Sequence, residues 1–582
     1  MLFPLLSLIT VALSLIPQSL ALTRHRHDHH NCPRGAILGD DSTPSLIVKR
    51  KPNLSPDYPL KFQVPLHIPP VKQPRIITVP ASSSTTFSNN TREILYFEIE
   101  IKTFQHTIFL DLGPATLVGY DGISPGPTLI IPRGTESIVR FVNNSPAKNS
   151  VHLHGSYSRT PFDGWAEDTT SPGEYKDYYF PNSQPARTLW YHDHAVHITA
   201  ENAYVGQAGV YLIHDPAEDA LGLSSGYEVY DIPMVLSYQT PLGRHDPRQR
   251  PTVALFERRA AQVPLPLPNA AVSRTFSLYM VATTNTNLKL PFHVIASDTG
   301  LLEKPVPVSQ LYISMAERYE IVFDFAPFAN QTLELRNFPK AGGAGVEVDY
   351  IDTDKVMRFR VAPPPTPSPS PLPTALRAVP FPHGANRTVA HRFKFARSRG
   401  QWLINGVGFV DAANRVLANV PRGTVEIWEI ENTTDGWSHP IHVHLVDFRV
   451  IFRGGTGTRG VALYERAGLK DVAHYAPWDG DDDMMAAFNV TALPGWGYPE
   501  GSGFADPMNP EWKARPYQMA DLRARGGPFA DGTVEERIRS MVARGAYVNV
   551  TEVKEALERY WDGNNTNSRR AVEFPRSRRL RI

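Results

Sequence analysis

Three His-x-His pairs could form a metal site. They are His152-Leu153-His154, His192-Asp193-His194 and His442-Val443-His444, and 20 histidines among 582 residues predict fewer than one such pair by chance. Residues i and i+2 of a β-strand project from one face, so both imidazoles of a pair can reach the same ion. Neutral imidazole binds copper, zinc and iron alike. The alternative is a set of satisfied core or surface histidines.

The segments around the pairs read as β-strands. Short runs of β-branched and aromatic residues alternate with turns containing Gly, Pro and Asn in the stretches 94–153, 230–361 and 401–452. This pattern predicts antiparallel sandwiches or barrels. We therefore expect an all-β protein of three domains.

Composition excludes several classes of protein. Lys and Arg number 59 against 58 Asp and Glu, so a net charge of +1 provides no field that would attract nucleic acid. The only cysteine is Cys32, which excludes an intrachain disulfide and a cysteine-rich zinc module.

The two ends of the sequence differ from the middle. Residues 1–21 are apolar and end in Ser19-Leu20-Ala21, which predicts a signal peptide, although a membrane anchor is the rival reading. Asn-x-Ser/Thr sequons suit surface loops of a secreted glycoprotein. They begin at Asn53, Asn89, Asn143, Asn330, Asn386, Asn432, Asn489, Asn549 and Asn564. A capping box at Thr533 predicts a short helical C-terminal extension, and the last fourteen residues, with six Arg, read as a solvated tail.

These features divide the chain into seven parts. We expect a signal peptide (1–21), a His-rich tail and lead-in (22–89), domain 1 (90–218), domain 2 (219–361), a Pro-rich linker (362–378), domain 3 (379–500) and the C-terminal extension (501–582). The linker composition is typical of a semi-rigid polyproline spacer.

The blocks around the histidines resemble the multicopper oxidases, and within them the fungal bilirubin oxidases and laccase-like enzymes. The matching blocks are 151–155, 162–165, 190–199, 204–209, 437–444, 483–490 and 505–512. The resemblance runs from about residue 90 to about residue 520. It implies cupredoxin-like Greek-key β-sandwich domains, copper as cofactor, and oxidation of a phenolic or tetrapyrrole donor with reduction of O₂ to water.

The resemblance also implies roles for individual residues. His152 and His442 match type 2 copper ligands, His154, His192, His194 and His444 match type 3 ligands, and His439 and Met484 match type 1 ligands. Asp163 matches an acidic residue that relays protons, with an Asp-Gly turn as the alternative. Trp437 matches the donor-binding surface, with a core aromatic as the alternative.

One block of the family is missing. The pattern His-Cys-His, followed four residues on by another His, has no counterpart between Gly468 and Met484, and no cysteine occurs after Cys32. A blue type 1 site needs a thiolate with two imidazoles. The chain as written is therefore expected to be inactive or severely impaired. Either two coding stretches have been misassigned as introns in a gene for an intact oxidase, or the chain is a non-catalytic copper-binding member of the family.

Partners follow from the same resemblance. We expect a monomer that uses a small-molecule donor and dioxygen and binds neither nucleic acid nor membrane. A ferroxidase is the rival enzyme, but it would need carboxylates near His439 to bind ferrous iron.

Overall fold

The computed structural model describes part of the chain. The described residues are 61–80, 91–108, 110, 113–227, 229–237, 254–259, 262–272, 274–338, 354–363, 371–382, 388–398, 401–421, 425–432, 439–454, 460–475, 485–491, 507–543 and 579–581. Among them, no helix combines the length and the apolar character that crossing a membrane requires. The predicted signal peptide, the His-rich tail up to residue 60 and Cys32 lie outside these residues.

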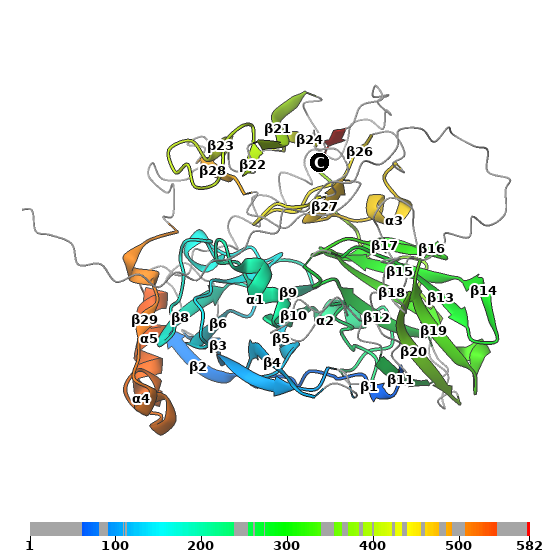
Figure 1. The fold of residues 1–582 in the computed structure, drawn as a ribbon, viewed down its shortest axis with the longest axis horizontal. Helices are drawn as coiled ribbons and strands as arrows, with labels where there is room; N and C mark the ends of the chain where they lie inside the picture. Colours follow the sequence, from blue (N-terminus) through cyan, green and yellow to red (C-terminus); the bar gives the residue numbers. More distant parts are fainter. Residues whose placement is uncertain are drawn as a thin grey trace, which may run out of the picture. The chain divides into compact units, whose positions relative to one another are not determined.

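The first sandwich, drawn in blue to teal in Figure 1 apart from the orange strand β29, encloses one core between two sheets. Its larger sheet contains, in order, β2 (Arg75–Pro80), β3 (Thr91–His106), β6 (Ser137–Asn144), β8 (Glu174–Phe180) and β29 (Arg515–Pro516), with β4 (Ala115–Tyr120) on β3. The smaller sheet contains β5 (Gly126–Pro132), β10 (Ala208–His214), β9 (Arg187–Asp193) and β7 (Val151–His154). The connections hold η1 (Thr160–Phe162), α1 (Thr199–Tyr204) and α2 (Pro216–Asp219).

The second sandwich, drawn in green, has its own core. One sheet contains β1 (Val64–Pro65), β11 (Ala254–Arg259), β20 (Lys355–Ala362), β19 (Thr332–Asn337), β13 (Phe276–Ala282) and β14 (Asn285–Leu290), with β17 (Leu311–Ile313) on β13. The other contains β12 (Gln262–Pro268), β18 (Arg318–Asp324), β15 (Phe292–Ser297) and β16 (Gly300–Val308), and η2 (Ala326–Phe328) follows β18. All seven residues of β13 are buried, as expected for an apolar central strand.

The described strands of the third unit form three separate groups. One sheet contains β22 (Gln401–Ile404), β21 (Val389–Ser398), β24 (Ile427–Asn432), β30 (Arg579–Arg581) and β26 (Phe452–Arg453). Two pairs stand alone among the described strands, β23 (Val416–Pro421) with β28 (Ala487–Thr491) and β25 (His439–His442) with β27 (Val472–Tyr475). The helix α3 (Leu463–Arg466) precedes β27.

The C-terminal segment adds helices to the first sandwich. It contains η4 (Pro510–Trp512), α4 (Met519–Ala524), η5 (Gly527–Phe529) and α5 (Asp531–Ala543). Val534, Ile538 and Met541 lie at i, i+4 and i+7 on α5 and are fully buried in the core of the first sandwich. The predicted helical extension therefore exists, but α5 begins at Asp531, two residues before the predicted capping box.

Three expectations need correction. The sandwiches are not purely antiparallel, because β3 pairs with β6 and β5 pairs with β10 in parallel. Arg579–Arg581 form strand β30 between β24 and β26 and are not a solvated tail. Asn143 is fully buried, and its amide group donates to the carbonyls of Ala147 and Thr170, so this sequon has no room for a glycan in the folded protein.

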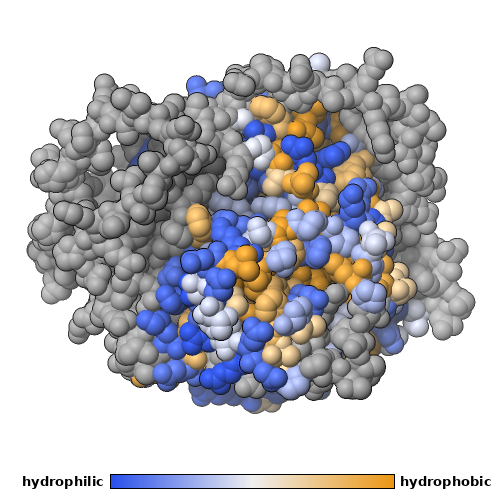
Figure 2. Space-filling model, turned by 90° about the vertical axis from the view of Figure 1, so that its right-hand side faces the viewer, coloured by the Kyte–Doolittle hydropathy of each residue, from blue (hydrophilic) through white to orange (hydrophobic). Residues whose placement is uncertain are grey.

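The surface drawn in Figure 2 is of mixed character. Hydrophilic and hydrophobic residues are interspersed over its coloured part. Single exposed apolar residues are normal on soluble proteins, so this face gives no reason to assign it a partner.

The burial of α5 gives a stability prediction. Ile538→Ala should lower the free energy of unfolding by about 2–5 kcal/mol, because it removes a buried aliphatic side chain from a packed core. Leu463→Ala is the control, since Leu463 is 71% exposed and its truncation should cost less than about 0.5 kcal/mol. Thermal or urea unfolding measures both variants, and equal losses would contradict the packing of α5.

Candidate metal centre

Three of the predicted histidines lie in two paired strands of the first sandwich, and a fourth directly follows one of them. In β7, His152 and His154 lie two residues apart, and His152 pairs directly with His192 on β9. His194 follows β9, and its backbone NH donates to the carbonyl of Ser150 at 2.7 Å. His152, His154 and His192 are all buried.

The third unit contributes the other two histidines. His442 ends β25, and its ring stacks on that of His154 with centroids 3.6 Å apart. The His444 ring lies 4.1 Å from that of His152 and 5.0 Å from that of His194. Imidazoles from two separated parts of the chain therefore meet in one cluster, as the sequence predicted.

Backbone and carboxylate acceptors determine the tautomers of four rings. A carbonyl or carboxylate oxygen only accepts, so each facing Nδ1 must carry the proton. The pairs are His152 Nδ1 with Asp163 O at 2.5 Å, His192 Nδ1 with Asp193 O at 2.7 Å, His442 Nδ1 with Asp471 O at 2.9 Å, and His444 Nδ1 with Asp163 Oδ2 at 2.8 Å. In their neutral form, the buried rings of His152, His192 and His442 are left with an unprotonated Nε2.

The free nitrogens then face one another. Nε2 of His152 lies 3.4 Å from Nε2 of His442, and Nδ1 of His154 lies 3.4 Å from Nε2 of His192. Two unprotonated nitrogens cannot hydrogen-bond, so the His152–His442 contact is repulsive unless a cation lies between them. Imidazole nitrogens bind first-row metal ions at about 2.0–2.1 Å, and a separation of 3.4 Å suits two ligands of one ion. The donor set therefore fits a metal such as copper.

Burial keeps the rings neutral, as metal ligation requires. It lowers the pKa of His152, and more strongly those of His154, His194 and His442, and neighbouring imidazoles or Arg318 add to the effect. For His192, burial lowers the pKa to about 3, and the neighbouring His152 adds to the effect. The buried Nε2 of His154 and Nδ1 of His194 also lack a hydrogen-bond partner, which leaves them available to a ligand.

Asp163 joins the two halves of the cluster. Its carbonyl holds His152 and its carboxylate holds His444. Burial alone would raise the pKa of Asp163, but His444 and His152 together lower it below its ordinary value. Asp163 also lies in the predicted Asp-Gly turn. Gly164 has a φ of +76°, and a Cβ there would lie 2.7 Å from the Cα of His152, so the turn favours glycine at this position. The two interpretations of Asp163 are thus compatible.

Two further residues around the cluster were not predicted. Asp193 accepts from the backbone NH of Ser150 at 2.8 Å and of Ala195 at 3.0 Å, which fixes the loop that carries His194. Asp471 Oδ1 lies 3.5 Å from Nε2 of His154. Asp193 stands inside a His-x-His pair and was visible in the sequence, whereas nothing local linked Asp471 to the histidines.

The predicted type 1 residues are not described. His439 lies in β25, but its side chain is outside the described part, as are Trp437 and Met484. Their roles remain predictions.

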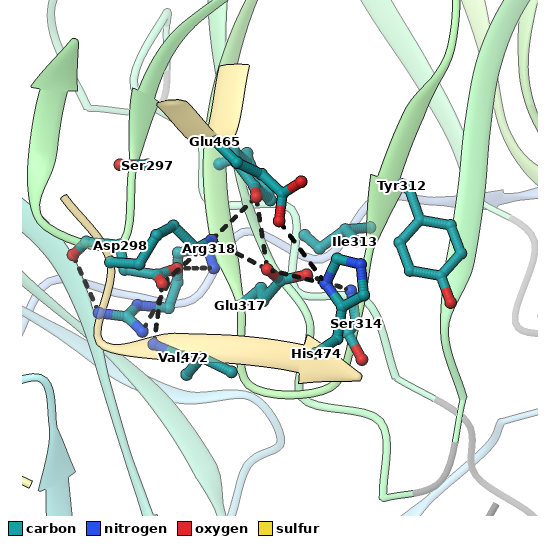
Figure 3. Close-up of polar contacts among 12 residues, drawn as sticks. Ser297, Asp298, Tyr312, Ile313, Ser314, Glu317, Arg318, Glu465, Val472 and His474 are labelled. Atoms are coloured by element: carbon teal, nitrogen blue, oxygen red, sulfur yellow. Dashed lines mark hydrogen bonds and ion pairs between the residues drawn. The ribbon is translucent and has the colours of Figure 1, made fainter. Parts of the chain in front are cut away.

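A second group with metal-binding side chains does not suit a cation. Glu317, Glu465 and His474 converge in Figure 3, with Nδ1 of His474 at 3.5 Å and 3.9 Å from the two carboxylates. However, Arg453 already binds both oxygens of Glu465 at 2.6 and 2.8 Å, and Lys470 Nζ lies 3.0 Å from Glu317. These cations occupy the positions that a metal ion would need.

Comparison with known proteins agrees with this geometry. Multicopper oxidase family models match residues 103–218 and 384–491. The chain is 51% identical over 549 residues to a bilirubin oxidase of Albifimbria verrucaria, covering 87% of this chain and 94% of that protein. It is 30% identical over 430 residues to a laccase of Bacillus subtilis, covering 62% and 80%. The crystal structure of McoA multicopper oxidase from Aquifex aeolicus shares the fold, with 23% identity, a TM-score of 0.59 and coverage of 71% and 90%.

Acid should destabilise the metal-free protein. Below pH about 6.5 the unfolded chain protonates its histidines, while the buried imidazoles stay neutral until their lower folded-state pKa is reached. The unfolded state then binds more protons, so stability is lost as the pH falls, by up to about 1.4 kcal/mol per pH unit for each such ring.

Thermal unfolding in a chelating buffer between pH 7.5 and pH 5 measures this effect. His192→Gln removes one titrating ring, so the unfolding midpoint of this variant should depend less on pH. A midpoint that stays constant over this range would contradict the neutral state of the cluster.

Proposed function

Because this chain belongs to the multicopper oxidase family, we propose that its six clustered imidazoles bind copper. The observation that carries the proposal is the 3.4 Å approach of two unprotonated nitrogens, His152 Nε2 and His442 Nε2. We assign His152 and His442 to the type 2 copper and His154, His192, His194 and His444 to the type 3 pair. Bound copper supplies one-electron redox chemistry. The protein holds the ligand rings neutral and oriented.

The route for electrons into this site is incomplete in the chain as written. We propose His439 and Met484 as the remaining ligands of a type 1 site. The thiolate ligand is missing, because the sole cysteine, Cys32, lies before all the segments that match the family. Two type 3 imidazoles are missing as well. We therefore propose that this chain binds copper but does not reduce dioxygen.

The alignment with the bilirubin oxidase of Albifimbria verrucaria contains gaps in this chain. The aligned stretch counts 549 positions, yet 87% of 582 residues is about 506, so about 40 aligned positions are gaps in this chain. A longer transcript would encode an oxidase that takes electrons from a phenolic or tetrapyrrole donor and reduces O₂ to water.

In that oxidase, Asp163 is the proposed proton relay. One carboxylate oxygen contacts Nδ1 of His444, and the other lies 3.5 Å from Nδ1 of His152, so Asp163 touches rings from both halves of the cluster. Trp437 is proposed to lie at the donor surface. The apolar first 21 residues and exposed Asn330 support a secreted glycoprotein, and we propose that it acts as a monomer.

Copper titration of the purified chain tests the first proposal. We expect tight Cu(II) binding with an electron paramagnetic resonance spectrum typical of nitrogen ligands, without an intense blue band near 600 nm and without O₂ consumption. His152→Gln should weaken binding by at least tenfold, because it removes a central ligand. His214→Gln is the matched control, since His214 is half-exposed and contacts Asp219 on the surface. An intense blue band, or equal affinity in both variants, would overturn the assignment.

Sequencing the transcript across codons 465 to 490 tests the second proposal. We expect extra coding sequence containing His-Cys-His. A protein with this segment restored should oxidise bilirubin or a phenol faster than ferrous iron, whereas the opposite order would identify a ferroxidase. Asp163→Asn in that protein should lower O₂ turnover at least tenfold. A transcript identical to the printed chain would leave the non-catalytic copper protein as the function.

A further inference from the structure

Arg318 is a buried residue that forms hydrogen bonds with all three parts of the fold. It begins β18 of the second sandwich and is 1% exposed. Its guanidinium group has five N–H donors, and all five have an acceptor. The acceptors are Asp471 Oδ1 at 2.5 Å, Asp471 Oδ2 at 2.5 Å, Thr188 O at 3.1 Å, Asp298 O at 2.9 Å and Ala316 O at 3.2 Å. Thr188 belongs to β9 of the first sandwich and Asp471 adjoins β27 of the third unit.

The loop 297–299 of the second sandwich holds the same segment by its backbone. Asp298 Oδ2 accepts from the backbone NH of Asp471 at 3.2 Å and of Val472 at 3.1 Å. The hydroxyls of Ser297 and Thr299 donate to the carbonyl of Leu469 at 2.8 and 3.0 Å. Figure 3 shows Arg318, Asp298 and Val472 joined in this way. Residues 469–472 are thereby fixed by a domain that contributes no histidine to the copper site.

Asp471, which is held by Arg318 and Asp298, contacts two of the histidines. Its carbonyl accepts from His442 Nδ1 at 2.9 Å and from the backbone NH of Val443 at 3.1 Å. Its carboxylate, held by Arg318, faces Nε2 of His154 at 3.5 Å. Asp471 thus fixes a ring of the third unit by a hydrogen bond and lies beside a ring of the first sandwich.

We propose that Arg318 and the loop 297–299 are positioning elements of the copper site, which act through Asp471 on His442 and His154. The inference rests on the copper binding proposed above. Gly155 agrees with it, since a Cβ at this position, whose φ is +87°, would lie 2.6 Å from both Arg318 Nη2 and Asp471 Oδ2. The strand that carries His154 therefore packs directly against the Arg318–Asp471 pair.

The test compares copper binding in three variants. Arg318→Lys keeps the charge, but a lysine ammonium group cannot replace the five N–H donors of the planar guanidinium group. A milder double variant, Ser297→Ala with Thr299→Val, removes only the two hydroxyls on Leu469. Arg336→Lys is the control, because Arg336 binds Glu334 through Nε and Nη2 in the same sandwich, and no hydrogen bond or ion pair among the described residues joins it to 469–472. Cu(II) affinity is measured by competition with a chelator, and the ligand geometry by the hyperfine coupling of bound Cu(II).

We expect Arg318→Lys to lose about 10- to 100-fold in affinity, the range for residues that orient metal ligands, and to change the hyperfine coupling. The double variant should lose at least threefold, and the control should match the parent chain. The proposal is wrong if either the Arg318→Lys variant or the double variant folds and keeps the Cu(II) affinity and hyperfine coupling of the parent chain. A parent chain that fails to bind copper would instead overturn the proposed function, so the two failures are distinguishable.

Discussion

The hydrogen bond from Nδ1 of a buried imidazole to a fixed oxygen is the interaction on which this site depends. It decides which nitrogen of the ring is unprotonated and where that nitrogen points. For His152, His192 and His442 the acceptor is a backbone carbonyl, which does not titrate and moves only with the strand or loop that carries it. The positions of the ligand nitrogens are therefore determined by how the strands pack.

This dependence explains why acidic residues surround a site made of histidine. Asp163 and Asp471 each provide a backbone carbonyl to one ring and direct a carboxylate toward another. Each joins a histidine of the first sandwich to one of the third unit. Asp163 is stabilised by the imidazole N–H groups beside it, and the charge of Asp471 is balanced by Arg318.

The sequence was sufficient for the parts of the fold that depend on local pattern. Strand-rich runs predicted the all-β class, which the structure and the related crystal structures confirm. The spacing of His152 and His154 predicted a shared strand face, and the recognised family blocks predicted the partner histidines. The parallel β3–β6 pairing and the insertion of β30 depend on contacts between distant residues, which no local pattern encodes. Arg318 was missed for the same reason, since 153 positions separate it from Asp471.

The burial of α5 in the first sandwich has a consequence for biosynthesis. N-terminal domains usually fold first while the chain is being made. Here Val534, Ile538 and Met541 fill the same core as Ile99 and Val139 from β3 and β6. The core of the first sandwich therefore lacks the side chains of α5 until nearly the whole polypeptide has been synthesised. During that time its apolar surface is exposed to chaperones.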